Sequence, residues 1–382
     1  MTTRPYDMRT LHAAAWAGDL EAVRRYVAEG DDLEATEAGG NGRKQTALNV
    51  AAHEGHVEIV RFLLAQGANP NGAGEGARMP MVDAFWAGKS EVVRLLLEAG
   101  AEVNAADEDG SHSLIHAASH DSVETEGERA SIIRLLIEGG GDIHHVNGAG
   151  MTPLMHAAHP NWPSQDQAAI VRLLIERGAE VTAALEDGST ALLIAAGMEE
   201  AETELARLLL DAGAKVNAGD WEGTTALMNA AWNGNDAMAK LLLERGADVN
   251  ARTVTTPGAE YYGGSTPLII AVKPGHREMV RLLLDHGANI DAQDDAGNSA
   301  LMWATWFGGN ESASPEERAQ NTLAMVRLLL ERGAEVNLRN IHGTTALDHA
   351  LDSGRAERIA LLVQAGVRRG EPQVTGVRFH SE

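Results

Sequence analysis

The sequence predicts an all-α fold, a solenoid of stacked helix-turn-helix units that carry β-hairpin fingers. The main observation is a recurring mark: a leucine-rich run, two further residues, then glycine and in most copies alanine. The glycines of this mark are Gly30, Gly67, Gly100, Gly140, Gly178, Gly213, Gly246, Gly287, Gly333 and Gly366. The shortest spacing is about 33 residues, and the longer ones correspond to one unit plus an insertion.

Each unit begins with signals for a short inner helix. The clearest openings are residues 152–158 (Thr-Pro-Leu-Met-His-Ala-Ala) and Thr266-Pro267-Leu268. A threonine N-cap accepts a hydrogen bond from an orphan N–H group, and proline at the first helical position has no N–H to satisfy. The Ala-Ala pair lets neighbouring inner helices approach closely.

The second helix of each unit contains the leucine run, which we expect to be its buried seam. The glycine after the run adopts the left-handed conformation that ends a helix. Two polar segments, Asp107–Gly110 and Asp220–Gly223, have the composition of hairpin tips.

Together these features closely resemble the ankyrin repeat, which is a turn followed by two antiparallel helices every ~33 residues. The second unit continues Gly55-His56-Val57-Glu58-Ile59-Val60 and closes with Gly67-Ala68-Asn69. The resemblance covers about Arg9 to Arg368, so we expect a single array over residues 1–370 and a C-terminal tail over 371–382. The predicted repeats are 9–35, 46–71, 79–105, 112–144, 152–182, 190–217, 225–250, 266–291, 299–337 and 345–367.

Charge restricts the partners. The chain has 31 Lys and Arg against 55 Asp and Glu, a formal net charge of -24. Such a surface repels phosphate backbones and anionic membranes, and it favours basic partners. We therefore expect neither a nucleic-acid nor a membrane partner.

Other absences narrow the classes further. The chain has no cysteine, which excludes disulfides and a cysteine nucleophile. Residues Met1–Thr10 lack the apolar region of a signal peptide, and no apolar run approaches the ~18 residues of a membrane span. We expect a cytoplasmic monomer that holds no metal and no cofactor.

Insertions mark where the array departs from its own pattern. Four lie between inner and outer helices, at Ser119–Ser131, His159–Ala169, Gly197–Glu204 and Trp306–Ala324; two lie in hairpins, at Thr36–Gln45 and Arg252–Ser265. One interpretation is that each insertion arose by neutral sequence drift, because loops tolerate insertion at little cost in stability. Alternatively, the three neighbouring insertions in repeats four to six form a functional rim.

Aromatic residues recur on the predicted groove. In ankyrin repeats the inner helix presents two positions to the concave face, the residue before Ala-Ala and the one three residues later. Four of the seven tryptophans share the second position, and tryptophan is favoured in binding hot spots. The alternative is that these rings pack on neighbouring helices. The predicted partner-binding residues are Trp16, His53, Trp86, His159, Trp221, Trp232, Tyr261, Tyr262, Trp303 and Trp306.

A second candidate site lies in repeats three to five. Asp83, His116 and His156 occupy the first of these two positions in three consecutive repeats, and Trp86 and His159 occupy the second position beside them. Such a constellation suits general acid–base chemistry or a divalent metal. The alternatives are a polar lining for a ligand or peptide, or solvated and helix-starting histidines.

We therefore expect a non-catalytic protein-protein interaction scaffold that binds a basic protein or peptide in an aromatic-lined groove. The alternative is a small-molecule-binding protein or enzyme with a polar Asp/His/Trp site in repeats three to five. No phosphate loop, His-Glu-x-x-His helix or Gly-x-Ser-x-Gly elbow occurs in the sequence.

Overall fold

The computed structural model describes residues 10–38, 44–73, 79–106, 109–119, 128–159, 166–197, 203–254, 263–306, 314–352 and 356–366. The chain divides into two compact units, Met1–Leu185 and Glu186–Glu382. Within the ranges above, every helix is too short or too polar to cross a bilayer.

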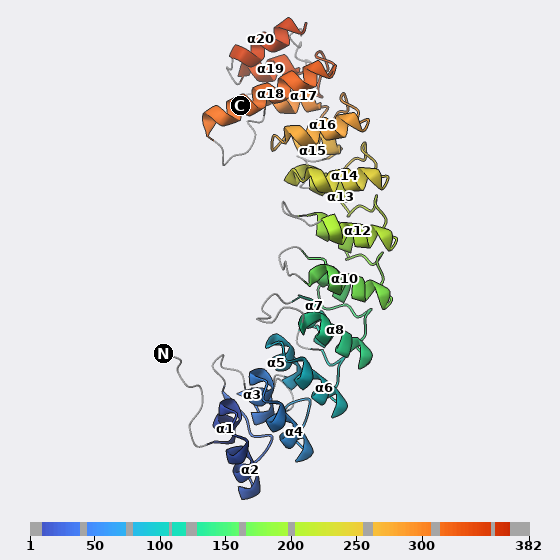
Figure 1. Ribbon diagram of the computed structural model, residues 1–382. Coiled ribbons are helices and arrows are strands. Elements are labelled where there is room, and N and C mark those ends of the chain that lie inside the picture. Colours follow the sequence, from blue (N-terminus) through green and yellow to red (C-terminus); the bar gives the residue numbers. More distant parts are fainter. Residues whose placement is uncertain are drawn as a thin grey trace, which may run out of the picture. The chain divides into compact units, whose positions relative to one another are not determined.

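The first unit alternates inner and outer helices along the chain (Figure 1). The inner helices are α1 (Leu11–Ala17), α3 (Ala47–Glu54), α5 (Pro80–Trp86), α7 (Ser113–Ser119) and α9 (Pro153–Ala157). The outer helices are α2 (Leu20–Glu29), α4 (Val57–Ala65), α6 (Ser90–Glu98), α8 (Glu128–Glu138) and α10 (Gln167–Glu176). A short hairpin, β1 (Glu37–Ala38) and β2 (Lys44–Gln45), pairs antiparallel.

The second unit repeats this plan. Its inner helices are α11 (Ala191–Ala196), α13 (Ala226–Asn233), α15 (Pro267–Val272), α17 (Ala300–Trp306) and α19 (Ala346–Asp352). Its outer helices are α12 (Thr203–Asp211), α14 (Asp236–Glu244), α16 (Arg277–Asp285), α18 (Pro315–Glu331) and α20 (Ala356–Gln364).

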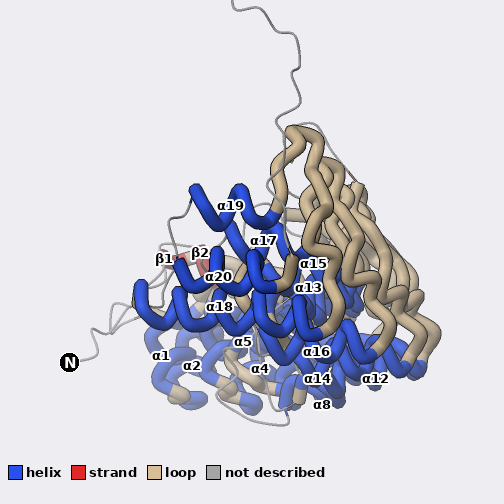
Figure 2. The backbone as a smooth tube through the Cα atoms, turned by 90° about the horizontal axis from the view of Figure 1, so that it is seen from above, coloured by secondary structure: helices blue, strands red, loops and turns tan. Residues whose placement is uncertain are grey.

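Each helix pair packs on the next one within its unit. Inner helices contact inner helices, as in α3 with α5 and α13 with α15, and outer helices contact outer helices, as in α6 with α8. The leucine run forms the seam, and Leu63, Leu96 and Leu242 are almost fully buried. The core of each unit therefore lies between its inner and outer helices, and most of the described loops between repeats project to one side of the helices (Figure 2).

The predicted start signals are confirmed. Thr46, Thr152, Thr225 and Thr266 each accept a hydrogen bond from the backbone three residues on, and Pro80, Pro153 and Pro267 occupy first helical positions. These caps satisfy N–H groups that a short helix leaves without partners.

Hairpin tips connect successive repeats through the backbone. In the second unit the amide of Trp221 donates to the carbonyl of Asp187, Val254 donates to Glu222, and Ile341 donates to Ala296. Closing asparagines add side-chain links, because Asn217 donates to Gly246 O while its Oδ1 accepts from Asp248 N. Each repeat thus completes backbone hydrogen bonding of its neighbour.

Two of the predicted insertions coincide with a different way of ending the inner helix. Where the turn is tight, as at Gly55, the backbone itself caps the helix. In repeat four, Arg129 instead donates to the carbonyls of Ala117 (2.9 Å) and Ala118. In repeat five, Gln167 Nε2 donates to the carbonyl of Ala157 (3.0 Å). Outer-helix side chains here satisfy carbonyls at the ends of the inner helices.

The insertion at Trp306–Ala324 is not wholly a loop. Its second half is helical, because α18 begins at Pro315, where Ser314 forms a capping box with Glu317. The sequence signal was a Ser-Pro-Glu-Glu start of the kind that begins helices. Residues 307–313 lie outside the described ranges.

We predict that Arg129→Met destabilises the first unit by about 2 kcal/mol. The substitution leaves two buried carbonyls without a donor, and relief from burying the guanidinium offsets only part of that cost. Urea unfolding followed by far-UV circular dichroism measures the effect. The control is Arg134→Met on the exposed face of the same helix, for which we expect a change within about 0.5 kcal/mol. Equal midpoints for the two variants would contradict the capping role.

Candidate functional site

The inner helices of the second unit present two exposed tryptophans. Trp232, on α13, is 44% exposed, and Trp306, at the end of α17, is 49% exposed. Both come from the second position of the predicted groove. A large aromatic ring that folding leaves half open to solvent retains apolar surface that a partner can bury.

Contacts from the next repeat position Trp232. The carbonyl of Trp232 accepts a hydrogen bond of 2.9 Å from His276 Nε2, and His276 is the N-cap residue of α16. Gly234, at φ 67°, permits this approach, since a Cβ there would lie 2.5 Å from His276 Nδ1. The first unit repeats the device at Trp16, whose carbonyl lies 3.2 Å from His56 Nε2.

Trp306 belongs to a stacked column that crosses three repeats. Its ring stacks on Trp303 at 5.2 Å between centroids and on His349 at 5.5 Å. On the far side, Lys273 Nζ lies 4.3 Å from the centroid of the Trp303 ring. The exposed Trp306 ring is thus stacked against two neighbouring rings.

Burial governs the electrostatics of this column. Lys273 is only 6% exposed, and desolvation lowers the pKa of its ammonium to about 8, against the opposing effect of Asp294. Asp294 also accepts a 2.7 Å hydrogen bond from Trp303 Nε1. Burial likewise lowers the pKa of His349.

Trp303 was predicted to contact a partner, and its position does not allow this. The ring is 3% exposed, enclosed by Lys273, Asp294 and Trp306. Its polar N–H has a buried acceptor, which is why a tryptophan can fill this inner position. Trp303 therefore acts as a buried support on which the exposed ring of Trp306 stacks.

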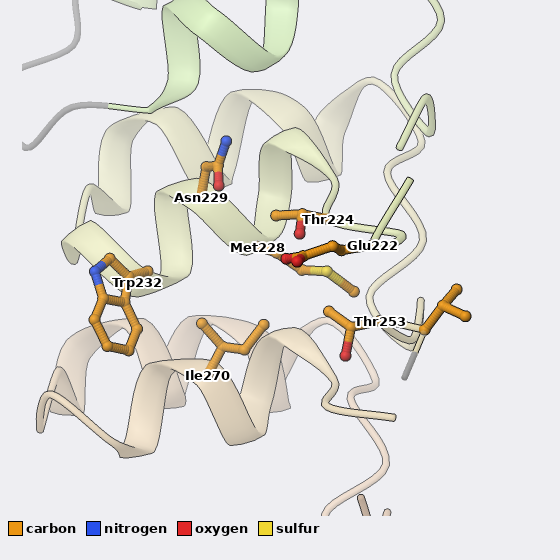
Figure 3. A pocket seen from close by; sticks show the side chains of 8 residues that line it. Glu222, Thr224, Met228, Asn229, Trp232, Thr253 and Ile270 are labelled. Atoms are coloured by element: carbon orange, nitrogen blue, oxygen red, sulfur yellow. The ribbon is translucent and has the colours of Figure 1, made fainter. Parts of the chain in front are cut away.

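A pocket opens next to Trp232, between α13 and α15 (Figure 3). It encloses about 550 Å³ when the space open to solvent is included. Its lining consists of Glu222, Thr224, Met228, Asn229, Trp232, Thr253, Val254 and Ile270. Glu222 is the single charged residue among them, and the sequence interpretation placed it only in a hairpin turn.

In the first unit the predicted groove residues differ in exposure. Trp86 is 39% exposed, Trp16 is half-buried, and His53 is exposed beside Glu54 at 3.3 Å. His159 is half-buried, and burial lowers the pKa of its imidazole. Trp86 is thus the most open of the tryptophans on the described inner helices of this unit.

Asp83 does not face the groove, contrary to the predicted constellation. Its side chain is fully buried and accepts a 2.7 Å hydrogen bond from Asn49 Nδ2 of the preceding repeat. Asn49 also accepts from Thr46 at the helix start, so the carboxylate completes a buried polar chain between α3 and α5. The ring of His116 instead stacks on Phe85 at 6.0 Å.

His156 is held neutral by its surroundings. Burial is the main cause that lowers its pKa to about 4, with smaller contributions from the neighbouring His159 and His116. Asn147 Nδ2 lies 3.2 Å from His156 Nε2 and donates to the unprotonated ring nitrogen. The structure therefore brings His116, His156 and His159 close enough to interact.

His112 and His145 in the same region have structural contacts. His112 Nε2 lies 2.9 Å from the carbonyl of Asp142, and its ring stacks on His145 at 4.2 Å. Across the described ranges, no group of three His, Cys, Asp or Glu residues is arranged to hold a metal ion.

The predicted finger aromatics have separate outcomes. Trp221 is 73% exposed at a hairpin tip of the second unit. Tyr261 and Tyr262 lie outside the described residues.

Comparisons with known proteins match much of the chain to one family. A model described as ankyrin repeats in three copies matches residues 11–107, 164–253 and 255–314, and a single ankyrin repeat matches 296–341. The ankyrin repeat domain of Bcl-3, a member of the IkappaB protein family, is similar in structure with a TM-score of 0.51. It is 31% identical, and the match covers 67% of this chain and 100% of that domain.

Curated relatives match over shorter segments. The mitochondrial liver isoform of glutaminase from Mus musculus is 39% identical over 72 residues, 19% of this chain and 11% of the enzyme. Protein phosphatase 1 regulatory subunit 27 from Mus musculus is 38% identical over 79 residues, 21% of this chain and 49% of that protein. The chain thus spans about half or less of the length of these relatives.

The depressed pKa of His156 predicts that acid destabilises the first unit. The folded imidazole has a pKa of about 4 and the unfolded one about 6.5, so unfolding takes up a proton between these values. Stability is complete above pH 6.5 and falls as the pH drops toward 4, with a loss of about 2 kcal/mol at pH 5.

Urea unfolding at pH 7 and pH 5 tests this linkage. His156→Leu removes the titrating group, so the loss between the two pH values shrinks by about 2 kcal/mol relative to wild type. The matched control is His144→Leu at an exposed position. An unchanged pH dependence in His156→Leu would show that the imidazole is not held neutral.

Proposed function

This chain belongs to the ankyrin-repeat family, and from that premise we propose that it is a non-catalytic scaffold that binds a partner protein or peptide. The binding surface is the inner-helix face of the second unit, which we define by the exposed rings of Trp232 and Trp306. The supporting observation is that both rings are about half exposed, while His276 of the next repeat binds the backbone carbonyl of Trp232 and His349 of the next repeat stacks on the ring of Trp306. Such rigid aromatic anchors lose little conformational entropy on binding.

The relatives add support of a general kind. The name of protein phosphatase 1 regulatory subunit 27 describes a protein that regulates another protein, and its matched segment is of the same kind as part of this chain. The net charge of -24 favours a basic partner, whose association weakens as salt screens the attraction.

The catalytic alternative has less support. A general base is most effective when its pKa lies near the working pH, whereas that of His156 is about 4. Asp83, the carboxylate that would orient a histidine, is buried against Asn49. These features suit packing between repeats better than proton transfer.

We predict that Trp232→Ala together with Trp306→Ala weakens partner binding by about 100-fold or more. Each ring buries apolar surface in the complex, and tryptophan hot spots each contribute about 2 kcal/mol. Affinity capture from a native lysate identifies the partner by mass spectrometry, and calorimetry with the purified partner measures the dissociation constant.

The control is Val363→Ala, which removes exposed apolar surface from the outer helix α20. We expect that variant to bind as wild type does. If the double tryptophan variant retains every interaction of the wild type, the inner-helix face of the second unit is not the binding surface.

A further inference from the structure

The pocket beside Trp232 has a mostly apolar lining and one negatively charged residue, Glu222. Met228, Ile270 and Val254 supply aliphatic surface, and the indole of Trp232 closes one end. Figure 3 shows the Glu222 carboxylate beside the side chain of Met228. An occupant therefore meets apolar groups along its length and a negative charge near the hairpin.

Glu222 stands out because it is available for pairing. Its backbone is engaged, since its amide donates to Asp220 Oδ1 at 2.9 Å and its carbonyl accepts from Val254. Its carboxylate forms no ion pair or hydrogen bond with any residue that the structure describes. The backbone contacts fix the residue, and its carboxylate lines the pocket with no ion pair to any described residue.

Charge and shape together limit what fits. An anionic group is repelled by Glu222, and a purely apolar side chain strips water from the carboxylate without replacing its hydrogen bonds. Lysine and arginine have an aliphatic stem that packs on apolar surface and a cationic end that pairs with a carboxylate. The same stem or cation also binds favourably against an indole ring.

We infer that the pocket lined by Glu222, Met228, Trp232 and Ile270 binds one lysine or arginine side chain of the partner protein, with Glu222 as its counter-ion. The inference rests on the proposed function, because it names the chemistry of the residue that the inner-helix face selects. Trp232 contributes a wall of the pocket, and His276 positions it through the 2.9 Å hydrogen bond to its carbonyl.

The test uses random linear 12-residue peptides displayed on phage and selected on the full-length chain. We expect the wild type to enrich peptides with Lys or Arg at one fixed position. Glu222→Gln keeps the shape of the side chain and removes its charge, so we expect it to lose the preference at that position only. Glu222→Lys reverses the charge and is expected to enrich Asp or Glu there.

Dissociation constants for one selected basic peptide, measured by fluorescence anisotropy, give the size of the effect. Loss of a charge-assisted pair predicts weakening of about tenfold in Glu222→Gln. Glu244→Gln changes the same charge at an exposed position on the outer helix α14 and is expected to bind as wild type does. Weakening by Glu244→Gln to the same extent would reduce the effect to net charge and overturn the inference.

Two further outcomes separate the inference from the proposed function. If peptides are selected, are lost in Trp232→Ala, but show the same residue preferences in wild type and Glu222→Gln, the face binds partners and the basic-residue pocket is wrong. If selected peptides bind equally to wild type and to the Trp232→Ala/Trp306→Ala variant, both the face and the pocket are wrong.

Discussion

The structure depends on contacts between successive repeats, because no single repeat satisfies its own backbone or buries its own core. The inner helices are six or seven residues long in most repeats and would not persist alone in water. What stabilises them is the next helix pair, the threonine caps, and the hydrogen bonds that run from each hairpin to its neighbour. Stability is then a sum over adjoining pairs.

The candidate site is a product of the same contacts. His276 belongs to the repeat after Trp232, and Lys273, Trp303 and His349 come from three successive repeats around Trp306. The pocket likewise takes Met228 from one inner helix and Ile270 from the next. A substitution that loosens one interface between repeats is therefore expected to move both a structural contact and part of the proposed binding face.

The sequence was sufficient to predict the fold and the position on the inner helices where tryptophans recur. Its repeated Thr-Pro, Ala-Ala and Leu-Leu-Leu signals act locally, and local signals determine helix starts, seams and ends. The sequence could not predict which residues before Ala-Ala are buried, because burial there depends on side chains of the adjoining repeat. Asp83 is buried against Asn49 of the preceding repeat, whereas His116, in the same position of its own repeat, is half-buried. The sequence did not indicate Glu222 for a similar reason, since the pocket that it lines is completed by Ile270, which lies far along the chain.

The exposed ring of Trp306 stacks on Trp303, and Trp303 in turn contacts the buried ammonium of Lys273. Burying Lys273 costs free energy, and this desolvation lowers the pKa of its ammonium, while the Trp303 ring and the negative charge of Asp294 offset part of the cost. Asp294 accepts the hydrogen bond of the Trp303 indole, on which Trp306 stacks, and its negative charge acts on the buried Lys273 ammonium. The chain thus retains a costly buried cation beside the stacked rings that support the exposed Trp306, as the proposed binding surface would require.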